Sequence, residues 1–330
     1  RTGSMLCFAI IGTGKISHTF MKAALKVPGF KLEAVCSRSQ DNGRAFGSVY
    51  GVDKVYTTLE SLADDKEVDA VYIASPNSSH CAQTVFMLEH GKHVLCEKPI
   101  ASNARELERM RKAADGNGRI LLEAMRPVFD PGFAKIKEVL PCLGQIRRAV
   151  FQYCQYSSRY DAFKNGVIEN AFNPALSNAA LMDIGVYCIH PMVLLFGRPQ
   201  RIMASGIFLH NHMEGAGTVL MDYGSMLGEA RYSKITDSAQ PSEIQGEDAN
   251  MLIWQIQDTR KIQVTYRDGR PETWEIQKED NNMYYEVQRM VELAQMDDGR
   301  ELAAAHLEGS VMEMEVMDKV RELTGIRFGE

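Results

Sequence analysis

Short apolar runs alternate with amphipathic segments along the first part of the chain. The β-rich runs are residues 7–11, 31–36, 69–74, 92–96 and 119–123. Between most of them, apolar residues recur at helical spacing over 16–26, 41–50, 80–90 and 103–115. This alternation favours a parallel sheet, and strands that are apolar almost throughout indicate helices on both of its faces. The pattern predicts an α/β fold with a doubly wound, Rossmann-type sheet over residues 1–124.

The pattern changes after about Arg126. Longer runs with alternating polar and apolar residues cover 146–156, 201–209, 216–223, 225–232 and 249–256, which favours an antiparallel or mixed sheet. One long helix is expected over 177–196, and two amphipathic helices around 283–295 and 308–324. We therefore expect a second α/β domain over 125–330, and the length of 330 residues also favours two domains.

The composition is that of a soluble globular protein. Hydrophobic residues make up 45% and charged residues 24% of the chain, and the formal net charge is −6. Nothing in this balance favours nucleic acid or an anionic membrane as a partner, and we expect no apolar run long enough to span a bilayer. Residues 1–4 resemble residues added for expression and are set aside.

The cysteines give an expectation about the cellular compartment. There are seven, none of them in a CxxC motif, and most lie within apolar stretches. An odd number of buried thiols is typical of a reducing compartment, so we expect a cytoplasmic protein. The chain offers no clustered ligand set for a metal ion, and none is expected.

A glycine loop follows the first predicted strand, in the stretch AIIGTGKIS (9–17). Gly12 suits a tight turn, and Gly14 allows a pyrophosphate to approach the backbone at the start of the next helix. Ser17 stands where the usual fingerprint has a third glycine. The alternative is an ordinary strand–helix turn. The position after the first strand favours a dinucleotide site formed by Gly12, Thr13, Gly14, Lys15 and Ile16.

The end of the second predicted strand bears on the choice of cofactor. NAD enzymes usually place a carboxylate there for the adenosine ribose. Here the strand runs into Ser37, Arg38 and Ser39, while Glu33 lies too early within it. A guanidinium flanked by hydroxyl groups suits a 2′-phosphate, so NADP is predicted in preference to NAD. The alternative is that Arg38 is a solvated loop residue.

Two later strands also end in polar residues. The stretch ASPNSSH (74–80) makes Ser75, Pro76, Asn77 and His80 candidate cofactor neighbours, because ligands bind at the carboxyl edge of such sheets. The alternative is a helix N-cap at Ser78 or Ser79, and both interpretations can hold together.

The fifth strand ends in VLCEKP (94–99), which brings Glu97 and Lys98 to the same edge. Lys98 could reach a substrate oxygen beside the nicotinamide and donate a proton or polarise a carbonyl group. A surface salt bridge is the alternative. The location at the ligand-binding edge favours the functional interpretation.

A second group of polar residues lies in ALMDIGVYCIHP (180–191). On an α-helix, Asp183, Tyr187 and His190 stand at i, i+4 and i+7 and share one face. This face would carry a carboxylate, a phenol and an imidazole. His190 alone could equally be a satisfied core histidine, but the three together favour a substrate site.

With these motifs the chain resembles the glucose–fructose oxidoreductase, inositol dehydrogenase and MocA (Gfo/Idh/MocA) family over nearly its whole length. CEKP and DIGVY carry the resemblance, supported by EAMRPVFDP (123–131) and YSSRYD (156–161). The resemblance implies a Rossmann domain and an α/β domain with a large open, mainly antiparallel sheet, which often forms a homodimer or homotetramer contact.

The resemblance also implies roles for the candidate residues. Lys98 matches the lysine of the EKP motif, and Asp183 the aspartate before the IG dipeptide. Tyr187 replaces the histidine of many members, as in the sugar oxidoreductase and dihydrodiol dehydrogenase branches. Two stretches depart from the family pattern: Ser177–Ala180, which is often glycine-rich, and Phe129–Pro131, which is often FHP.

The function expected from this resemblance is hydride transfer between nicotinamide C4 and a secondary alcohol or carbonyl of a sugar, polyol or diol. Tyr187 would transfer the hydroxyl proton, and the Lys98 ammonium would stabilise the tyrosinate. Asp183 would orient the substrate or Lys98, and His190 would contact the substrate. The alternative is a non-catalytic NAD(P)-binding sugar sensor on the same fold.

Overall fold

The computed structural model describes residues 4–329, and residues 1–3 of the segment set aside above lie outside this range. The chain forms two compact units. Unit 1 contains the chain up to Met125 and Glu279–Val311, and unit 2 contains Arg126–Lys278 and the chain from Met312 on. The sequence placed everything after residue 124 in the second domain, whereas 279–311 pack with unit 1.

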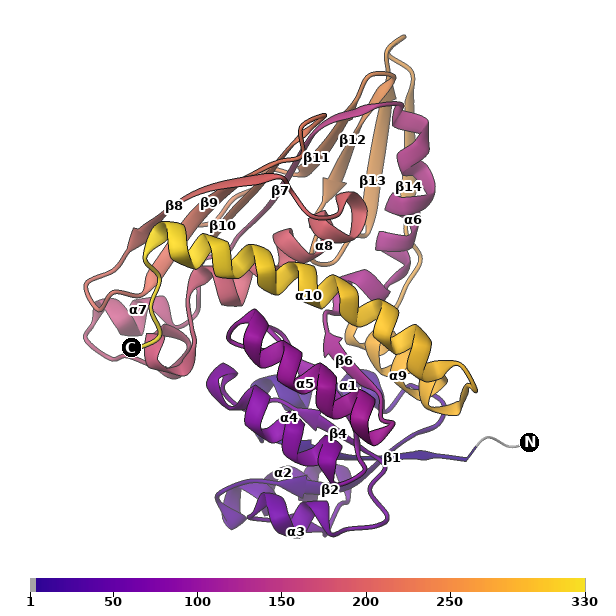
Figure 1. Cartoon of the computed structure of the whole chain (residues 1–330), viewed down its shortest axis with the longest axis vertical. Coiled ribbons are helices and arrows are strands. Elements are labelled where there is room, and N and C mark those ends of the chain that lie inside the picture. The colour runs from indigo at the N-terminus through magenta and orange to yellow at the C-terminus, as the bar shows by residue number, and fades with distance from the viewer. Residues whose placement is uncertain (1–3, 330) are drawn as a thin grey trace. The chain divides into compact units, whose positions relative to one another are not determined.

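Unit 1 contains a six-stranded sheet in the order β3-β2-β1-β4-β5-β6, and every pair in it is parallel (Figure 1). The strands are β1 (Leu6–Ile11), β2 (Phe30–Cys36), β3 (Val55–Tyr56), β4 (Ala70–Ile73), β5 (His93–Glu97) and β6 (Leu121–Ala124). All four residues of β4 and of β6 are buried, as expected where both faces of a sheet are covered. The Rossmann-type sheet predicted from the sequence is confirmed.

Helices connect these strands and complete unit 1. They are α1 (Lys15–Ala24), α2 (Gln40–Tyr50), α3 (Leu59–Ala63), α4 (His80–Glu89) and α5 (Ala104–Asn117), followed much later by α9 (Met283–Gln295) and the first part of α10 (Gly299–Thr324). The apolar face of α9 joins the core through Val287 and Met290, which cluster with Phe20 of α1. Asn281 also donates a 2.8 Å hydrogen bond to the Thr19 carbonyl. These contacts explain why 279–311 belong to unit 1.

Unit 2 contains an eight-stranded sheet in the order β14-β13-β12-β11-β7-β10-β9-β8. The strands are β7 (Ile146–Cys154), β8 (Arg201–Phe208), β9 (Glu214–Asp222), β10 (Leu227–Ser233), β11 (Ser242–Gly246), β12 (Ala249–Trp254), β13 (Lys261–Tyr266) and β14 (Pro271–Glu275). Only β7 and β10 pair in parallel, and the other pairs are antiparallel. This confirms the mainly antiparallel sheet.

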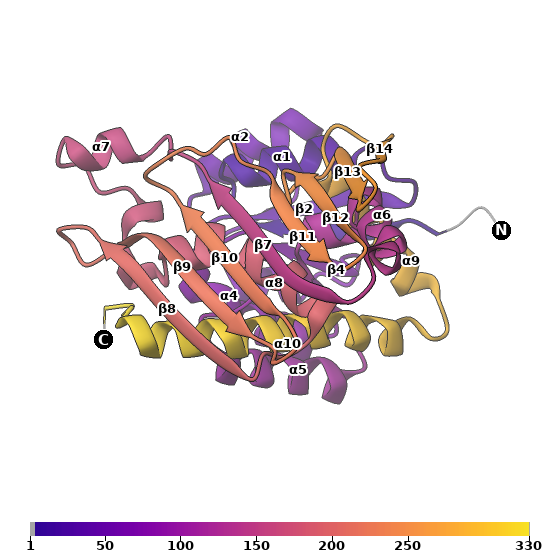
Figure 2. The same cartoon turned by 90° about the horizontal axis from the view of Figure 1, so that it is seen from above.

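Unit 2 also contains helices, and one of them lies on one face of the sheet. The longer ones are α6 (Pro131–Val139), α7 (Tyr160–Lys164) and α8 (Val186–Phe196), and the short ones are η2 (Arg126–Phe129), η3 (Leu140–Leu143), η4 (Asn170–Phe172), η5 (Pro174–Leu176) and η6 (Leu181–Gly185). α8 packs on β7 and β10. The view in Figure 2 shows no helix in front of the opposite face. Met203 and Ile207 of β8 are exposed there by 55% and 60%.

One stretch of the described residues, Pro174–Phe196, is long and apolar enough to cross a membrane by length and composition. The sequence predicted a long helix over 177–196 but no apolar run long enough to span a bilayer. In its most apolar window 78% of the residues are buried inside the structure. It therefore has the character of a core helix rather than of a membrane span.

Candidate active site

The glycine loop has the geometry that its residues require. Gly12 has a φ of +107°, and a Cβ at this position would lie 2.7 Å from the Ala74 carbonyl oxygen, so only glycine fits. A Cβ at Gly14, in contrast, would meet no atom within 4 Å. The backbone at the N-terminus of α1 is therefore open to a ligand, and its first-turn N–H groups suit an anion such as pyrophosphate.

Ser17 replaces the third glycine without loss of packing. Its hydroxyl donates a 2.8 Å hydrogen bond to the Gly12 carbonyl, and the residue is fully buried. The substitution thus ties the first turn of α1 back to the glycine loop.

Arg38 lies exposed at the end of β2, beside the capping serines. Ser39 caps α2 by accepting from the Asn42 N–H, and Ser37 Oγ accepts from the Ser39 N–H. Glu33 is ion-paired with Lys54 at 2.8 Å and also with Lys31. The carboxylate of β2 is thus engaged in ion pairs, and the first charged side chain after the strand is the exposed guanidinium of Arg38.

His80 connects two loops at the carboxyl edge of the sheet. Its ring nitrogens lie 2.9 Å from the Ser75 carbonyl and 2.8 Å from the Pro99 carbonyl, and the side chain is buried. Burial lowers the pKa of His80, and the two carbonyl oxygens act in the opposite direction. A neutral ring donates to only one of them at a time. His80 therefore holds the Ser75 loop against the loop that follows Lys98.

The residues around Lys98 are held from within unit 1. The Tyr72 hydroxyl donates a 2.5 Å hydrogen bond to Glu97. After Pro99, the Ile100 N–H donates to buried Glu123, which also accepts from Ser310. The Lys98 side chain is half-buried.

In unit 2, Asp183 and Tyr187 lie on consecutive helical segments. Asp183 belongs to η6, a π-helical turn of a kind that recurs at functional sites, and Tyr187 lies in the first turn of α8. The Tyr187 ring centroid is 5.7 Å from that of Tyr153 on β7. Asp183 forms a 3.1 Å ion pair with Lys234, which directly follows β10.

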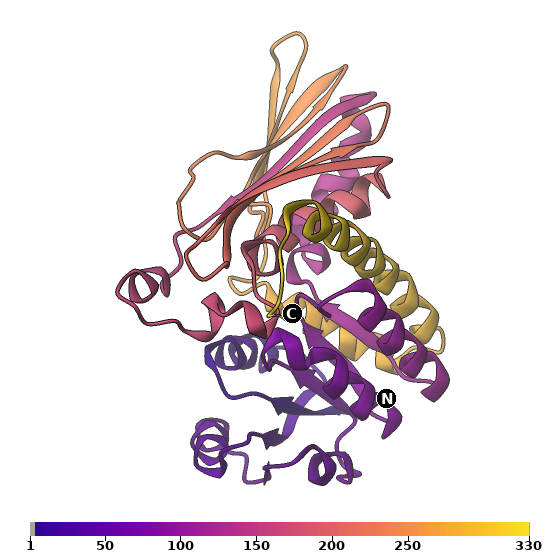
Figure 3. The ribbon, with the colours of Figure 1, turned by 60° about the vertical axis from the view of Figure 1, so that its left-hand side comes forward.

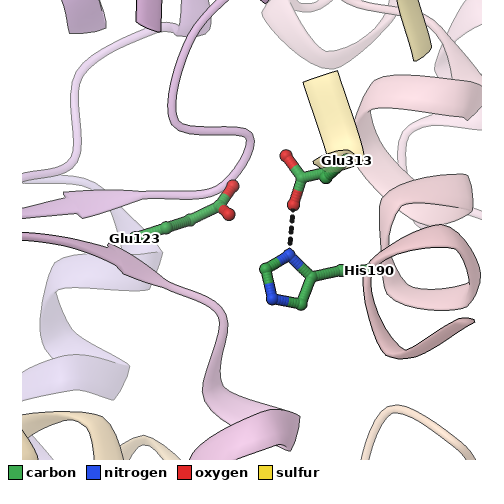
Figure 4. A group of neighbouring side chains, drawn as sticks. All are labelled: Glu123, His190 and Glu313. Carbon is green, nitrogen blue, oxygen red and sulfur yellow. Dashed lines mark hydrogen bonds and ion pairs between the residues drawn. The ribbon is translucent and has the colours of Figure 1, made fainter. Parts of the chain in front are cut away.

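His190 faces a different environment. Its Nδ1 lies 2.7 Å from Glu313 Oε1, and both side chains are buried. Figure 4 shows the imidazole of α8 directed at the Glu313 carboxylate of α10. The sequence predicted one face shared by Asp183, Tyr187 and His190. Tyr187 and His190 are three residues apart in α8, whereas Asp183 lies in the π-helical turn before it. The partner of His190 fits the alternative of a satisfied core histidine.

Glu214, the first residue of β9, is hydrogen-bonded to the first residue of η6. Its carboxylate accepts a 2.7 Å hydrogen bond from the Leu181 N–H and a longer one from the Tyr232 hydroxyl. Burial raises the pKa of Glu214 to about 7. The backbone that carries Asp183 is thus anchored to a buried carboxyl group.

A pocket of about 280 Å³ lies at the C-terminal end of β7, beside the residues that precede β11. Five glutamines line it together with Tyr153, Ser238 and Trp254, and none of its described lining residues is charged. Amides both donate and accept hydrogen bonds, and aromatic rings offer flat apolar faces. This lining suits a neutral polyhydroxylated ligand.

Both units match known protein families. Residues 6–125 match the oxidoreductase family with an NAD-binding Rossmann fold, and residues 134–251 match the GFO/IDH/MocA C-terminal domain. The chain belongs to the Gfo/Idh/MocA family.

Curated relatives and solved structures within and around this family are similar to the chain over most of its length. Scyllo-inositol 2-dehydrogenase (NADP⁺) IolU of Bacillus subtilis is 43% identical over 324 residues, which cover 98% of each chain. Trans-1,2-dihydrobenzene-1,2-diol dehydrogenase of Danio rerio is 31% identical over 66% of this chain and 65% of the relative. The structure of KijD10, a 3-ketoreductase from Actinomadura kijaniata, in complex with NADP and TDP-benzene, has a TM-score of 0.84 at 19% identity and covers 97% of this chain and 98% of that one.

The two departures from the Gfo/Idh/MocA pattern have local explanations. Ser177 has a φ of +64°, a conformation that favours glycine. Asp130 caps α6 by accepting from the Gly132 N–H and forms a 2.8 Å ion pair with the buried ammonium of Lys278. Asp130 is thus itself part of a buried structural network.

Three residues that support the candidate loops and helices were not among the candidates predicted from the sequence. They are Glu123, Glu214 and Lys234. Each is buried and contacts a candidate loop or helix across a long stretch of chain. Glu123 is the first residue of EAMRPVFDP, but that motif does not show its contacts, and no motif marks Glu214 or Lys234. Each contact depends on the tertiary fold.

Proposed function

We propose that the chain is an NADP-preferring oxidoreductase that transfers a hydride between nicotinamide C4 and a secondary alcohol or carbonyl of a neutral polyol, sugar or diol. The observation that carries the proposal is the 43% identity to an NADP-dependent scyllo-inositol dehydrogenase over 98% of both chains. The exposed Arg38 and the engaged Glu33 support the preference for NADP.

The bound nicotinamide would supply the hydride chemistry, and side chains of this protein would manage the proton and the developing charge. In the proposal Tyr187 exchanges the proton of the substrate hydroxyl. The Lys98 ammonium stabilises negative charge on the same oxygen and on the tyrosinate. Asp183 orients a second substrate hydroxyl. Glu97 and His80 hold the loop that carries Lys98, by their hydrogen bonds to Tyr72 and to Pro99.

The pocket beside β7 supports a neutral substrate. It lies next to Tyr153, whose ring packs near Tyr187. Uncharged amide, hydroxyl and aromatic groups match the hydroxyls and the apolar ring face of a polyol or sugar, and they provide no cation for a phosphate.

The test is a spectrophotometric assay with NADPH or NADP⁺ and a panel of inositols, aldoses, ketoses and diols. We expect turnover with at least one of them. Tyr187→Phe should lower kcat by about 10² to 10⁴ without changing the Kd for NADPH, and Lys98→Met should have a comparable effect. Tyr223→Phe is the matched control, because the half-buried Tyr223 hydroxyl donates a 3.0 Å hydrogen bond to the Gly197 carbonyl, away from the candidate residues.

Two outcomes would contradict the proposal. A Tyr187→Phe variant with nearly full rate would remove the role of the phenol. NADPH binding without turnover of any substrate would instead favour the non-catalytic sensor.

We further propose that the protein is a cytoplasmic homodimer or homotetramer that associates through the uncovered face of the eight-stranded sheet. Exposed apolar side chains along β8, Met203 and Ile207 among them, support this choice of surface. The free thiols of the cysteines support a reducing compartment.

A further inference from the structure

Lys234 is a lysine with almost no contact with solvent. Its side chain is only 1% exposed, whereas that of Asp183, its ion-pair partner, is 39% exposed. A buried ammonium is costly unless its hydrogen-bond donors are satisfied and its charge is compensated. The contacts of Lys234 therefore require an explanation.

The ammonium has three partners in unit 2. It donates a 2.7 Å hydrogen bond to the Ala171 carbonyl and forms the 3.1 Å ion pair with Asp183 Oδ2. The ring of Phe172 lies 4.5 Å from it, within the range of a cation–π interaction. Three N–H groups thus meet two oxygens and one aromatic face.

These partners belong to two segments that are far apart in sequence. Ala171 and Phe172 lie in the excursion that leaves the sheet after β7 and includes α7 (Figure 3). Asp183 lies on η6, which is held at its first residue by Glu214. Lys234 is thus the link between the excursion and the turn that presents Asp183.

We propose that Lys234 is a positioning residue for Asp183: it fixes one carboxylate oxygen of a side chain that is 39% exposed to solvent. The excursion is held to the same ammonium, so the position of Asp183 and the conformation of residues 171–172 depend on each other. This inference rests on the proposed function, in which Asp183 orients a substrate hydroxyl.

A double-mutant cycle tests the proposal. Lys234→Met should lower kcat/KM about 10- to 100-fold, because loss of a positioning contact misplaces Asp183. In an Asp183→Asn background the same substitution should change kcat/KM by less than about 3-fold, since there is no longer a carboxylate to position. Equal losses in both backgrounds would overturn the proposal, because a merely structural lysine gives additive effects.

Two further variants make the cycle specific. Lys234→Gln keeps a donor for the Ala171 carbonyl and lacks the charge that holds Asp183, so it should lose nearly as much activity as Lys234→Met and replaces it if that variant does not fold. Lys164→Met is the matched control. Lys164 lies in the same excursion and faces the rings of Tyr156 and Tyr160, but it forms its ion pair with Asp161 instead of Asp183. It should retain normal kcat/KM.

The same link can be tested by thermal or chemical denaturation, without an activity assay. Lys234→Gln and Asp183→Asn should shift the denaturation midpoint non-additively, because each removes the partner of the other. If the wild-type protein turns over no sugar, polyol or diol, the proposed function fails and this measurement alone decides on the link: additive shifts overturn it.

Discussion

Glu214 should make the stability of unit 2 depend on pH. The carboxyl group is buried beneath η6, and burial raises its pKa from 4.5 to about 7. A group whose pKa is higher in the folded than in the unfolded protein favours folding. This contribution to the free energy of unfolding is complete at a pH below the unfolded pKa, and it is lost as the pH rises to the folded pKa. At about 1.4 kcal/mol per pKa unit, the loss between pH 4.5 and 7 amounts to about 3 kcal/mol.

Glu214→Gln removes this dependence while it preserves the shape of the side chain. The glutamine oxygen can still accept from the Leu181 N–H, and the amide carries no charge at any pH. Relative to the wild type, the variant should therefore gain about 3 kcal/mol in free energy of unfolding between pH 4.5 and 8. The absolute difference at one pH also contains changed hydrogen bonds, so the change with pH is the quantity to compare.

Tryptophan fluorescence during denaturation reports on the unfolding of unit 2, which contains Glu214. The chain has two tryptophans, Trp254 and Trp274, and both lie on strands of unit 2. Glu229→Gln is the matched control, because this half-exposed carboxylate of the neighbouring strand is paired with Arg231. The control should differ from the wild type by less than about 1 kcal/mol at all pH values. Parallel pH curves for the wild type and Glu214→Gln would refute the reasoning.

Two further predictions concern the cofactor and the assembly. Arg38→Ala should raise the Kd for NADPH about 10- to 100-fold and change that for NADH little, because only NADPH carries the 2′-phosphate; equal effects in fluorescence titrations of both cofactors would exclude this role. The double variant Met203→Glu and Ile207→Glu should sediment as a smaller species than the wild type, because it introduces charges into an apolar contact. The control Leu25→Glu, at an exposed site of unit 1, should sediment like the wild type. An unchanged mass of the double variant would exclude this face as the interface.

The sequence was informative wherever local periodicity determines structure. The alternation before residue 124 predicted the parallel sheet, and the pattern of α9 predicted Met283–Gln295 with the same bounds. The two-residue β3 was missed, because so short a strand has no periodicity of its own. The packing of α9 in unit 1 was missed as well. An amphipathic pattern shows that a helix has an apolar face, but not which core that face joins.

The candidate site was predictable to a similar extent. Gly12 could be recognised because a tight turn after a strand requires a residue that tolerates positive φ. The common face of Asp183, Tyr187 and His190 was inferred from regular α-helical spacing. Asp183 lies in the π-turn of η6, which interrupts that spacing, while Tyr187 and His190 stay three residues apart in α8, where His190 contacts Glu313. Whether Lys98 and Tyr187 act on one substrate oxygen stays a prediction.

Glu214 and Lys234, which contact η6, show why the remaining residues of the candidate site could not be predicted. Glu214 and Leu181 are 33 residues apart, and Lys234 and Ala171 are 63 apart, so no local pattern connects them. Charged residues are usually solvated, and only the fold buries these two. Glu214 holds the first residue of the turn and Lys234 holds Asp183 itself. The two anchors carry opposite charges, so a rise in pH and the loss of Lys234 should displace Asp183 in separable ways. Glu214→Gln should abolish the displacement caused by the rise in pH and leave the displacement caused by the loss of Lys234 unchanged.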